Sequence, residues 1–214
     1  MPTIVCFGDS NTHGSDPRST GRLGPDVRWP GVLRRELGPG FEVVEEGLPG
    51  RTTAVDDPLS PGRDGSALLQ PILWTHEPVD LVIVMLGTND LKVTLHPDPA
   101  RVAHGAARLV DLARQSLAGP GETPPLVLLV APVPLAAPSD SAELWGFDER
   151  SIELSRDLAR RYRVIARDTP GVAFFDAGSV ATVSRADGVH LDPEAHAAIG
   201  QALAAEVRRL SRGR

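Results

Sequence analysis

Ser10, Asp187 and His190 are side chains whose types could together perform nucleophilic catalysis in this 214-residue chain. A serine hydroxyl attacks a carbonyl effectively only when a base removes its proton, and a histidine held by a carboxylate is such a base. Asp187 and His190 are three residues apart, so one turn of a loop could carry both. We therefore interpret Ser10 as a nucleophile, His190 as its base and Asp187 as the carboxylate that orients the base.

Each of these groups has a plainer interpretation when it is taken alone. Residues 8–10 read Gly-Asp-Ser, which is also the composition of an ordinary turn. A third polar segment, residues 87–90, favours the catalytic interpretation because it too directly follows an apolar run. Loops that leave parallel strands converge above the carboxyl edge of the sheet. The sequence therefore predicts one site at that edge.

Five short apolar runs are typical of strands that are covered on both faces, which indicates a parallel sheet. They cover residues 3–7, 41–46, 81–86, 126–131 and 172–175. Amphipathic segments alternate with them, and apolar residues recur at helical spacing over residues 100–117 and again after Pro193. This alternation predicts an α/β fold, a three-layer α/β/α sandwich with a five-stranded parallel sheet, in one domain over residues 1–214.

Metal chemistry is the main rival interpretation of the polar clusters. Asp187, His190 and His196 could act as ligands, but the sequence has no His-x-x-x-His pair and no cysteine cluster. We therefore expect no metal and no cofactor. Pro193 begins a predicted helix, which we expect to place His196 on the surface.

Four blocks of the sequence resemble the markers of the GDSL esterases of the SGNH hydrolase superfamily. They are Gly8-Asp9-Ser10, Gly50 after Pro49, Gly87-x-Asn89-Asp90 and Asp187-x-x-His190, and they span nearly the whole chain. The resemblance implies a flavodoxin-like SGNH hydrolase fold and a serine esterase that forms an acyl-serine intermediate.

An oxyanion hole must accompany such a nucleophile, because attack on an ester carbonyl creates a negatively charged oxygen. The backbone N–H of Ser10 is one donor, and the resemblance implies that the N–H of Gly50 and the side-chain amide of Asn89 are the others. A turn glycine after Pro49 is the alternative interpretation of Gly50. We expect Asp9 and Asp90 to hold the loops through hydrogen bonds to backbone N–H groups.

Several further segments are similar to one branch of the superfamily, the intracellular oligomeric arylesterases and acyltransferases. They are residues 25–30, 41–48, 51–53, 56–58, 85–90 and 174–180. The similarity implies hydrolysis of short-chain acyl or aryl esters, some acyl transfer to alcohols, and a homo-oligomer, with octamers among the known assemblies.

The residues expected at the entrance to the pocket differ from those of that branch. Asn11, His13 and Ser15 stand where the acyl-transferring relative has apolar or aromatic residues. We expect these three residues and Trp145 to line a more polar substrate pocket, in which hydrolysis outweighs acyl transfer. A carbohydrate O-deacetylase with the same triad is the alternative function, since a polar entrance would suit it. A non-catalytic scaffold on this fold is the remote alternative.

Three long loops are expected to contribute to the pocket and to contacts between subunits. Residues 15–26, 56–65 and 131–147 are rich in glycine and proline, and we expect them to wall the pocket and to form subunit interfaces. The alternative is that these segments are ordinary surface loops.

A net charge of −6 argues against nucleic-acid or anionic-membrane partners. Cys6 is the single cysteine and no signal peptide is visible, so a cytoplasmic protein is expected.

Overall fold

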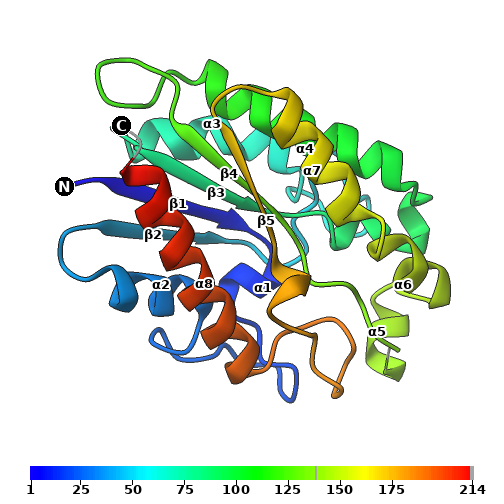
Figure 1. Cartoon of the computed structure of the whole chain (residues 1–214). Coiled ribbons are helices and arrows are strands. Elements are labelled where there is room, and N and C mark those ends of the chain that lie inside the picture. The colour runs from blue at the N-terminus through cyan, green and yellow to red at the C-terminus, as the bar shows by residue number, and fades with distance from the viewer. Residues whose placement is uncertain (138, 213–214) are drawn as a thin grey trace.

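A parallel sheet forms the centre of the computed structural model, which describes residues 1–137 and 139–212 (Figure 1). In that part of the chain the sheet has five strands, in the order β2-β1-β3-β4-β5. They are β1 (Thr3–Gly8), β2 (Glu42–Gly47), β3 (Leu81–Met85), β4 (Leu126–Ala131) and β5 (Val172–Asp176). All neighbouring strands are parallel. The predicted strands are therefore confirmed.

Helices connect the strands and follow the last one. They are α1 (Ser10–His13), α2 (Trp29–Leu37), α3 (Gly65–Thr75), α4 (Pro99–Gln115), α5 (Asp140–Leu144), α6 (Glu149–Ser155), α7 (Leu158–Asp168) and α8 (Pro193–Ser211). Short 3₁₀ turns accompany them: η1 (Asn89–Leu91), η2 (Val93–Leu95) and η3 (Ala177–Ser179). None of the helices within the described ranges is long and apolar enough to cross a bilayer.

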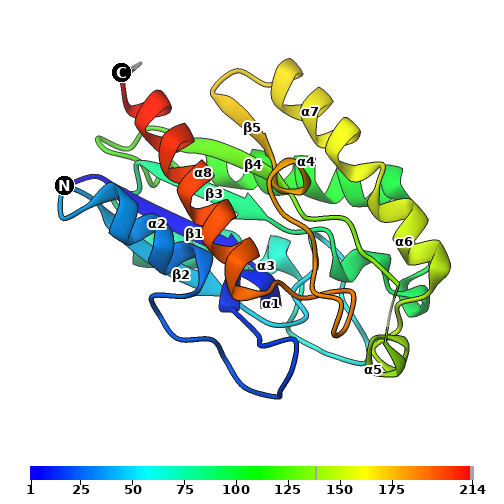
Figure 2. The same ribbon diagram turned by 60° about the horizontal axis from the view of Figure 1, so that its bottom comes forward.

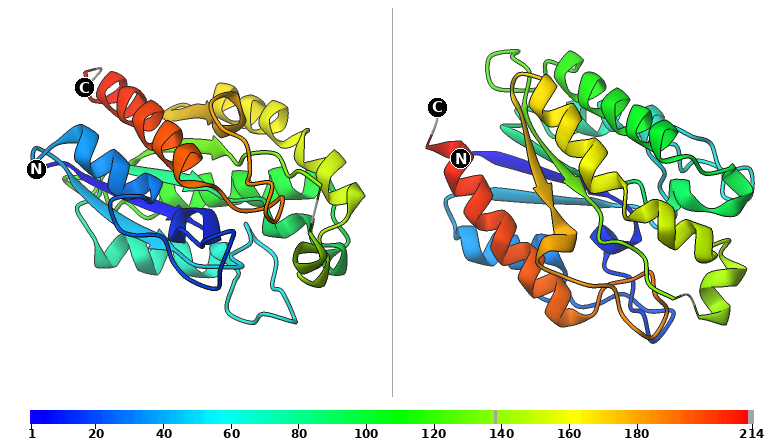
Figure 3. Two further views of the ribbon diagram at one scale, coloured as in Figure 1. Left: turned by 90° about the horizontal axis from the view of Figure 1, so that it is seen from below. Right: turned by 45° about the vertical axis from the view of Figure 1, so that its right-hand side comes forward.

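Two helical layers cover the sheet, because alternate side chains of a strand point to opposite faces. In β1, Val5 and Phe7 belong to the core under α3, α4 and α7, whereas Ile4 and Cys6 belong to the core under α2 and α8. Figures 1 and 3 show α2 and α8 together on one face and α3, α4 and α7 on the other. The three-layer α/β/α sandwich is confirmed.

Two connecting helices that the sequence analysis did not predict contain prolines. Helix α2 has Pro30 in its first turn, where the missing N–H has no helical partner to lose. Helix α3 contains Pro71 in its interior. The predicted loop 131–147 also differs from expectation, because residues 140–144 within it form the short helix α5.

Helix α1 lies directly on the carboxyl ends of β1 and β2, and two glycines permit this close approach. A Cβ atom on Gly8 would lie 2.0 Å from the Thr12 hydroxyl oxygen, and one on Gly47 would lie 2.2 Å from the His13 amide nitrogen. Real Cβ atoms do not approach other atoms so closely. Glycine at both positions therefore lets the chain turn sharply and place Ser10 at the edge of the sheet.

Candidate active site

Ser10, His190 and Asp187 form one line of hydrogen bonds. The Oγ of Ser10 lies 3.0 Å from Nε2 of His190, and Nδ1 of His190 lies 2.7 Å from Oδ2 of Asp187. All three residues are buried. The structure therefore brings together the three side chains that the sequence analysis selected from opposite ends of the chain.

The position of Asp187 is fixed by its other oxygen as well. Its Oδ1 accepts hydrogen bonds from the backbone N–H groups of Val189 and His190, each at 2.9 Å. Burial alone would raise the pKa of Asp187, but the hydrogen bonds from the His190 ring and from these two N–H groups outweigh it and hold the pKa below its usual value. Asp187 is therefore an anion that faces the imidazole.

Ser10 is positioned by the start of α1. Asp9 is the residue before the helix, and its side chain accepts a hydrogen bond from the N–H of Asn11 at 2.9 Å. Ser10 is the first helical residue, so its own N–H has no partner inside the helix. The Ser10 N–H is thus available in the place where the sequence analysis expected an oxyanion donor.

Gly50 and Asn89 border the same cavity as Ser10. Gly50 has a φ of +81°, a backbone conformation that favours glycine. The amide nitrogen of Asn89 donates to the carbonyl of Arg51 at 3.1 Å and has a longer contact of 3.4 Å with Oδ2 of Asp9. The first bond orients the amide, and the longer contact leaves its second N–H weakly engaged.

Asp90 holds the neighbouring loop in the way that was expected of it. Both of its carboxylate oxygens accept a hydrogen bond from the N–H of Thr53, at 3.1 and 3.0 Å. Burial raises the pKa of Asp90 to about 6, and burial likewise raises that of Asp9 to about 6. Both carboxyl groups therefore accept from backbone N–H groups around the site, as predicted, although the group bound by Asp9 is in α1 rather than in a loop.

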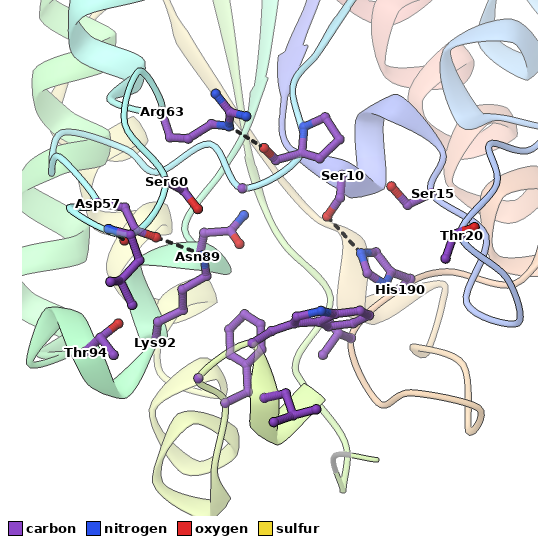
Figure 4. Close-up of a pocket in the computed structure, with 18 of the residues that line it drawn as sticks. Ser10, Ser15, Thr20, Asp57, Ser60, Arg63, Asn89, Lys92, Thr94 and His190 are labelled. Carbon is purple, nitrogen blue, oxygen red and sulfur yellow. Dashed lines mark hydrogen bonds and ion pairs between the residues drawn. The ribbon is translucent and has the colours of Figure 1, made fainter. Parts of the chain in front are cut away.

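A cavity of about 540 Å³ opens in front of Ser10 (Figure 4). Residues from each of the three long loops line it: Ser15, Asp16, Ser19, Thr20 and Gly21 from the first, Asp57, Leu59, Ser60 and Arg63 from the second, and Leu144, Trp145, Gly146 and Phe147 from the third. The prediction that these loops wall a pocket is borne out.

Of the four predicted pocket residues, Ser15 and Trp145 line this cavity, but Asn11 and His13 do not. Helix α1 is a single turn, so successive side chains leave it in different directions and only Ser10 faces the cavity from it. Asn11 is buried behind the cavity and donates to the carbonyl of Val189 at 3.2 Å. The carbonyl of His13 accepts a hydrogen bond from Arg22.

Trp145 contacts His190. Its ring meets the ring of His190 edge to face, with centroids 5.4 Å apart and an angle of 74° between the planes. Trp145 is nevertheless 47% exposed, because it stands at the rim of the cavity. His190 is therefore in contact with an indole that solvent also reaches.

The prediction that His196 lies on the surface is wrong. His196 is in α8 as expected, but its side chain is fully buried, and its Nδ1 accepts a hydrogen bond from the N–H of Trp29 at 3.2 Å. Burial lowers the pKa of His196 to about 4. The sequence did carry a signal, since His196 lies three residues before Ile199 and seven before Leu203 on the apolar stripe of α8.

Two cations at the cavity, Arg63 and Lys92, were not singled out by the sequence analysis. They lie in different segments, and only the fold brings both to the cavity wall. No group of three or more His, Cys, Asp or Glu residues within residues 1–137 and 139–212 is placed to hold a metal ion.

Comparison with known proteins identifies the family of this chain. Residues 6–198 match the model of the GDSL-like lipase/acylhydrolase family. The chain belongs to that family. No curated protein sequence matches it. The GDSL and SGNH assignment made from the four sequence blocks is confirmed, and family membership supports ester hydrolysis as the coarse activity.

Several solved structures are similar to this chain over nearly its full length. The M. smegmatis aryl esterase is 42% identical with a TM-score of 0.92, covering 98% of this chain and 100% of its own. Est24, a carbohydrate acetylesterase from Sinorhizobium meliloti, is 39% identical with a TM-score of 0.91 and the same coverage. A putative arylesterase from Agrobacterium tumefaciens is 45% identical with a TM-score of 0.90, again with that coverage.

Proposed function

We propose that this protein hydrolyses short-chain acyl or aryl esters through an acyl-Ser10 intermediate. The observation that carries the proposal is the unbroken hydrogen-bonded line from Ser10 Oγ through His190 to Asp187 at a cavity wall. A hydroxyl, an imidazole and a carboxylate in this order are what nucleophilic catalysis by serine requires.

The reaction proceeds in two balanced halves. Ser10 Oγ forms a bond to the ester carbonyl carbon while its proton passes to Nε2 of His190. The tetrahedral intermediate then breaks its bond to the alcohol or phenol oxygen, which takes that proton from His190. Water next gives a proton to His190 and attacks the acyl carbon, and Ser10 leaves with the proton restored. Asp187 holds the imidazole in its working tautomer and stabilises the imidazolium formed in each half.

The oxyanion of both intermediates is stabilised by the N–H groups of Ser10 and Gly50 and by the amide of Asn89. Support for this assignment comes from their common position at the cavity beside the nucleophile. The hydrogen bond from Asn89 to the Arg51 carbonyl supports it further, because a donor that is already oriented needs no reorganisation during the reaction.

Replacement of the nucleophile tests the proposal. Ser10→Ala should abolish nearly all hydrolysis of 4-nitrophenyl acetate, and a serine-directed phosphonate should add one mass equivalent to the wild type but not to this variant. Ser15→Ala is the matched control, because Ser15 lines the same cavity without contacting His190 in the described geometry. Retained activity in Ser10→Ala, or labelling at another residue, would overturn the assignment.

Acetylated carbohydrates are the second candidate substrates. The hydroxyl-bearing wall made by Ser15, Ser19 and Thr20 favours them, since such side chains can bond to sugar hydroxyls. Est24, which is named a carbohydrate acetylesterase, adds support by similarity. A comparison of kcat/KM for acetylated sugars and for aryl acetates distinguishes the two substrate classes.

We propose further that the protein is a cytoplasmic homo-oligomer, with an octamer as one form, and that it has neither nucleic-acid nor membrane partners. Leu59 and Leu144, which line the cavity, are 75% and 87% exposed, and such apolar side chains at a rim suit contact with another subunit. Light scattering should give a mass well above that of a dimer. An active monomer of 22.7 kDa would refute the assembly.

A further inference from the structure

One end of the cavity carries positive charge and spare hydrogen-bond donors. Arg63 and Lys92 lie there, whereas the aromatic side chains of Trp145 and Phe147 line another side. In Figure 4 both Arg63 and Lys92 lie on the side of the view away from His190, with Arg63 above Asn89 and Lys92 below it. The cavity in front of Ser10 is therefore chemically divided.

The charge of Arg63 is not neutralised by an acidic partner. Its Nε donates to the carbonyl of Pro49 at 2.8 Å, and its Nη1 has a 3.3 Å contact with the carbonyl of Pro61. Both acceptors are neutral, and none of the ion pairs found among the described residues includes Arg63. A half-buried guanidinium thus borders the cavity with donors to spare.

Lys92 also has donors beyond those that it uses. Its Nζ lies 3.0 Å from Oδ2 of Asp57, whose side chain is only 1% exposed, while the Lys92 side chain is 12% exposed. The other oxygen of Asp57 accepts from the N–H of Leu59. An ammonium group has three N–H donors, so this ion pair leaves Lys92 able to bind a further acceptor. Arg63 then gives this end of the cavity a net positive charge.

The side of the substrate that meets these cations follows from the position of His190. The leaving oxygen must face Nε2 of His190 in order to receive its proton, so the acyl chain extends away from His190. We propose that Arg63 and Lys92 form a subsite for an anionic group, a carboxylate in particular, on the acyl part of the ester. This proposal rests on the acyl-serine chemistry proposed above. A guanidinium and an ammonium are the side-chain groups that bind carboxylates most strongly.

Matched charged and neutral esters test the subsite. The 4-nitrophenyl half-esters of glutaric and adipic acid are compared with analogues in which a terminal amide replaces the carboxylate, after subtraction of the uncatalysed rates. The wild type should prefer the carboxylate by about tenfold in kcat/KM, the value of one good charge-assisted hydrogen bond. This preference should weaken as salt screens the charges.

Variants of Arg63 separate its charge from its hydrogen bond. Arg63→Gln should bring the ratio of the two kcat/KM values close to one, whereas Arg63→Lys should keep much of the preference. Because Arg63 also holds the Pro49 carbonyl beside Gly50, either variant can slow both esters. The ratio cancels that shared effect, since both esters use the same oxyanion donors.

Two further outcomes would overturn the subsite. Equal rates on charged and neutral half-esters would exclude it while leaving the esterase function intact. A preference for a carboxylate on the alcohol part, measured with 4-acetoxybenzoate against 4-acetoxybenzamide, would exclude its placement on the acyl side. Failure of the wild type to hydrolyse any ester, including 4-nitrophenyl acetate, would instead overturn the proposed function.

Discussion

The side chain of Asn11 donates a hydrogen bond to the carbonyl of Val189, 3.2 Å away, and so joins the helix that carries Ser10 to the loop that carries His190. The two residues are 178 positions apart and both are buried. Only a buried polar group of the right length can make this link. It connects the segments of Ser10 and His190 independently of the contact between those two side chains.

Removal of this link should lower stability. Asn11→Ala leaves the buried Val189 carbonyl without its donor, which typically costs about 1–3 kcal/mol of the free energy of unfolding. Urea unfolding measures the loss. Thr12→Val is the matched control, because the buried hydroxyl of Thr12 has no hydrogen-bond partner among the described residues, so the change should cost little. Equal losses in both variants would contradict the role of Asn11.

Asn89→Ala should lower kcat by about 100- to 1,000-fold if the amide stabilises the oxyanion, because that donor acts mainly in the transition state. KM should change much less. Steady-state kinetics with an aryl acetate measures both constants. The thermal midpoint of the variant is the control, since Asn89 also holds the Arg51 carbonyl. A fall in kcat of only a few-fold in a folded variant would remove Asn89 from the oxyanion hole.

His196 should make the protein sensitive to acid. Its pKa is about 4 in the folded protein, against an ordinary value of 6.5 once the chain unfolds, so the unfolded chain binds more protons between these values. The stability that the neutral imidazole contributes is present above pH 6.5 and is lost as the pH falls towards 4. At ~1.36 kcal/mol per pKa unit the loss is about 3 kcal/mol.

The measurement compares unfolding of the wild type and of His196→Asn at pH 7 and at pH 4. Asparagine keeps an acceptor for the N–H of Trp29 but does not titrate, so the gap between the two proteins should shrink or reverse at low pH. Asp9 and Asp90, whose raised pKa values act in the opposite direction, are common to both proteins and cancel. Parallel stability curves would refute the assignment.

Ser15 should limit acyl transfer to alcohols. Water is present at about 55 M, so an alcohol competes for the acyl-Ser10 intermediate only where apolar contacts concentrate it, each buried CH₂ contributing roughly 0.8 kcal/mol. Ser15 lines the cavity and offers no such surface. With a vinyl ester and benzyl alcohol in buffer, free acid should dominate early, and Ser15→Trp should increase the share of benzyl ester. A wild type that already forms mostly benzyl ester would disprove the argument.

The sequence was sufficient to predict the sheet and to select the three side chains that the structure brings together. Ser10 and Asn89 follow apolar strands directly, and the topology of a parallel sheet then requires them to meet at one edge. The sequence did not predict which side chains of the one-turn helix α1 face the cavity, because their direction depends on how that helix packs against Gly47. The presence of Arg63 and Lys92 at one cavity could not be predicted from the sequence either, since it arises from the tertiary arrangement of two loops.

Ser10 and His190 are 180 residues apart in the sequence, so the ribosome makes Ser10 well before His190, and this order has a consequence for when esterase activity appears. His190 immediately precedes α8, which packs against α2 on the face of the sheet that includes Ile4 and Cys6 of β1 (Figure 2). A nascent chain that displays Ser10 therefore has no His190 beside it until the segment up to α8 has been made and has docked. Esterase activity should appear as a late, all-or-none event, which would make turnover a sensitive reporter of completed folding.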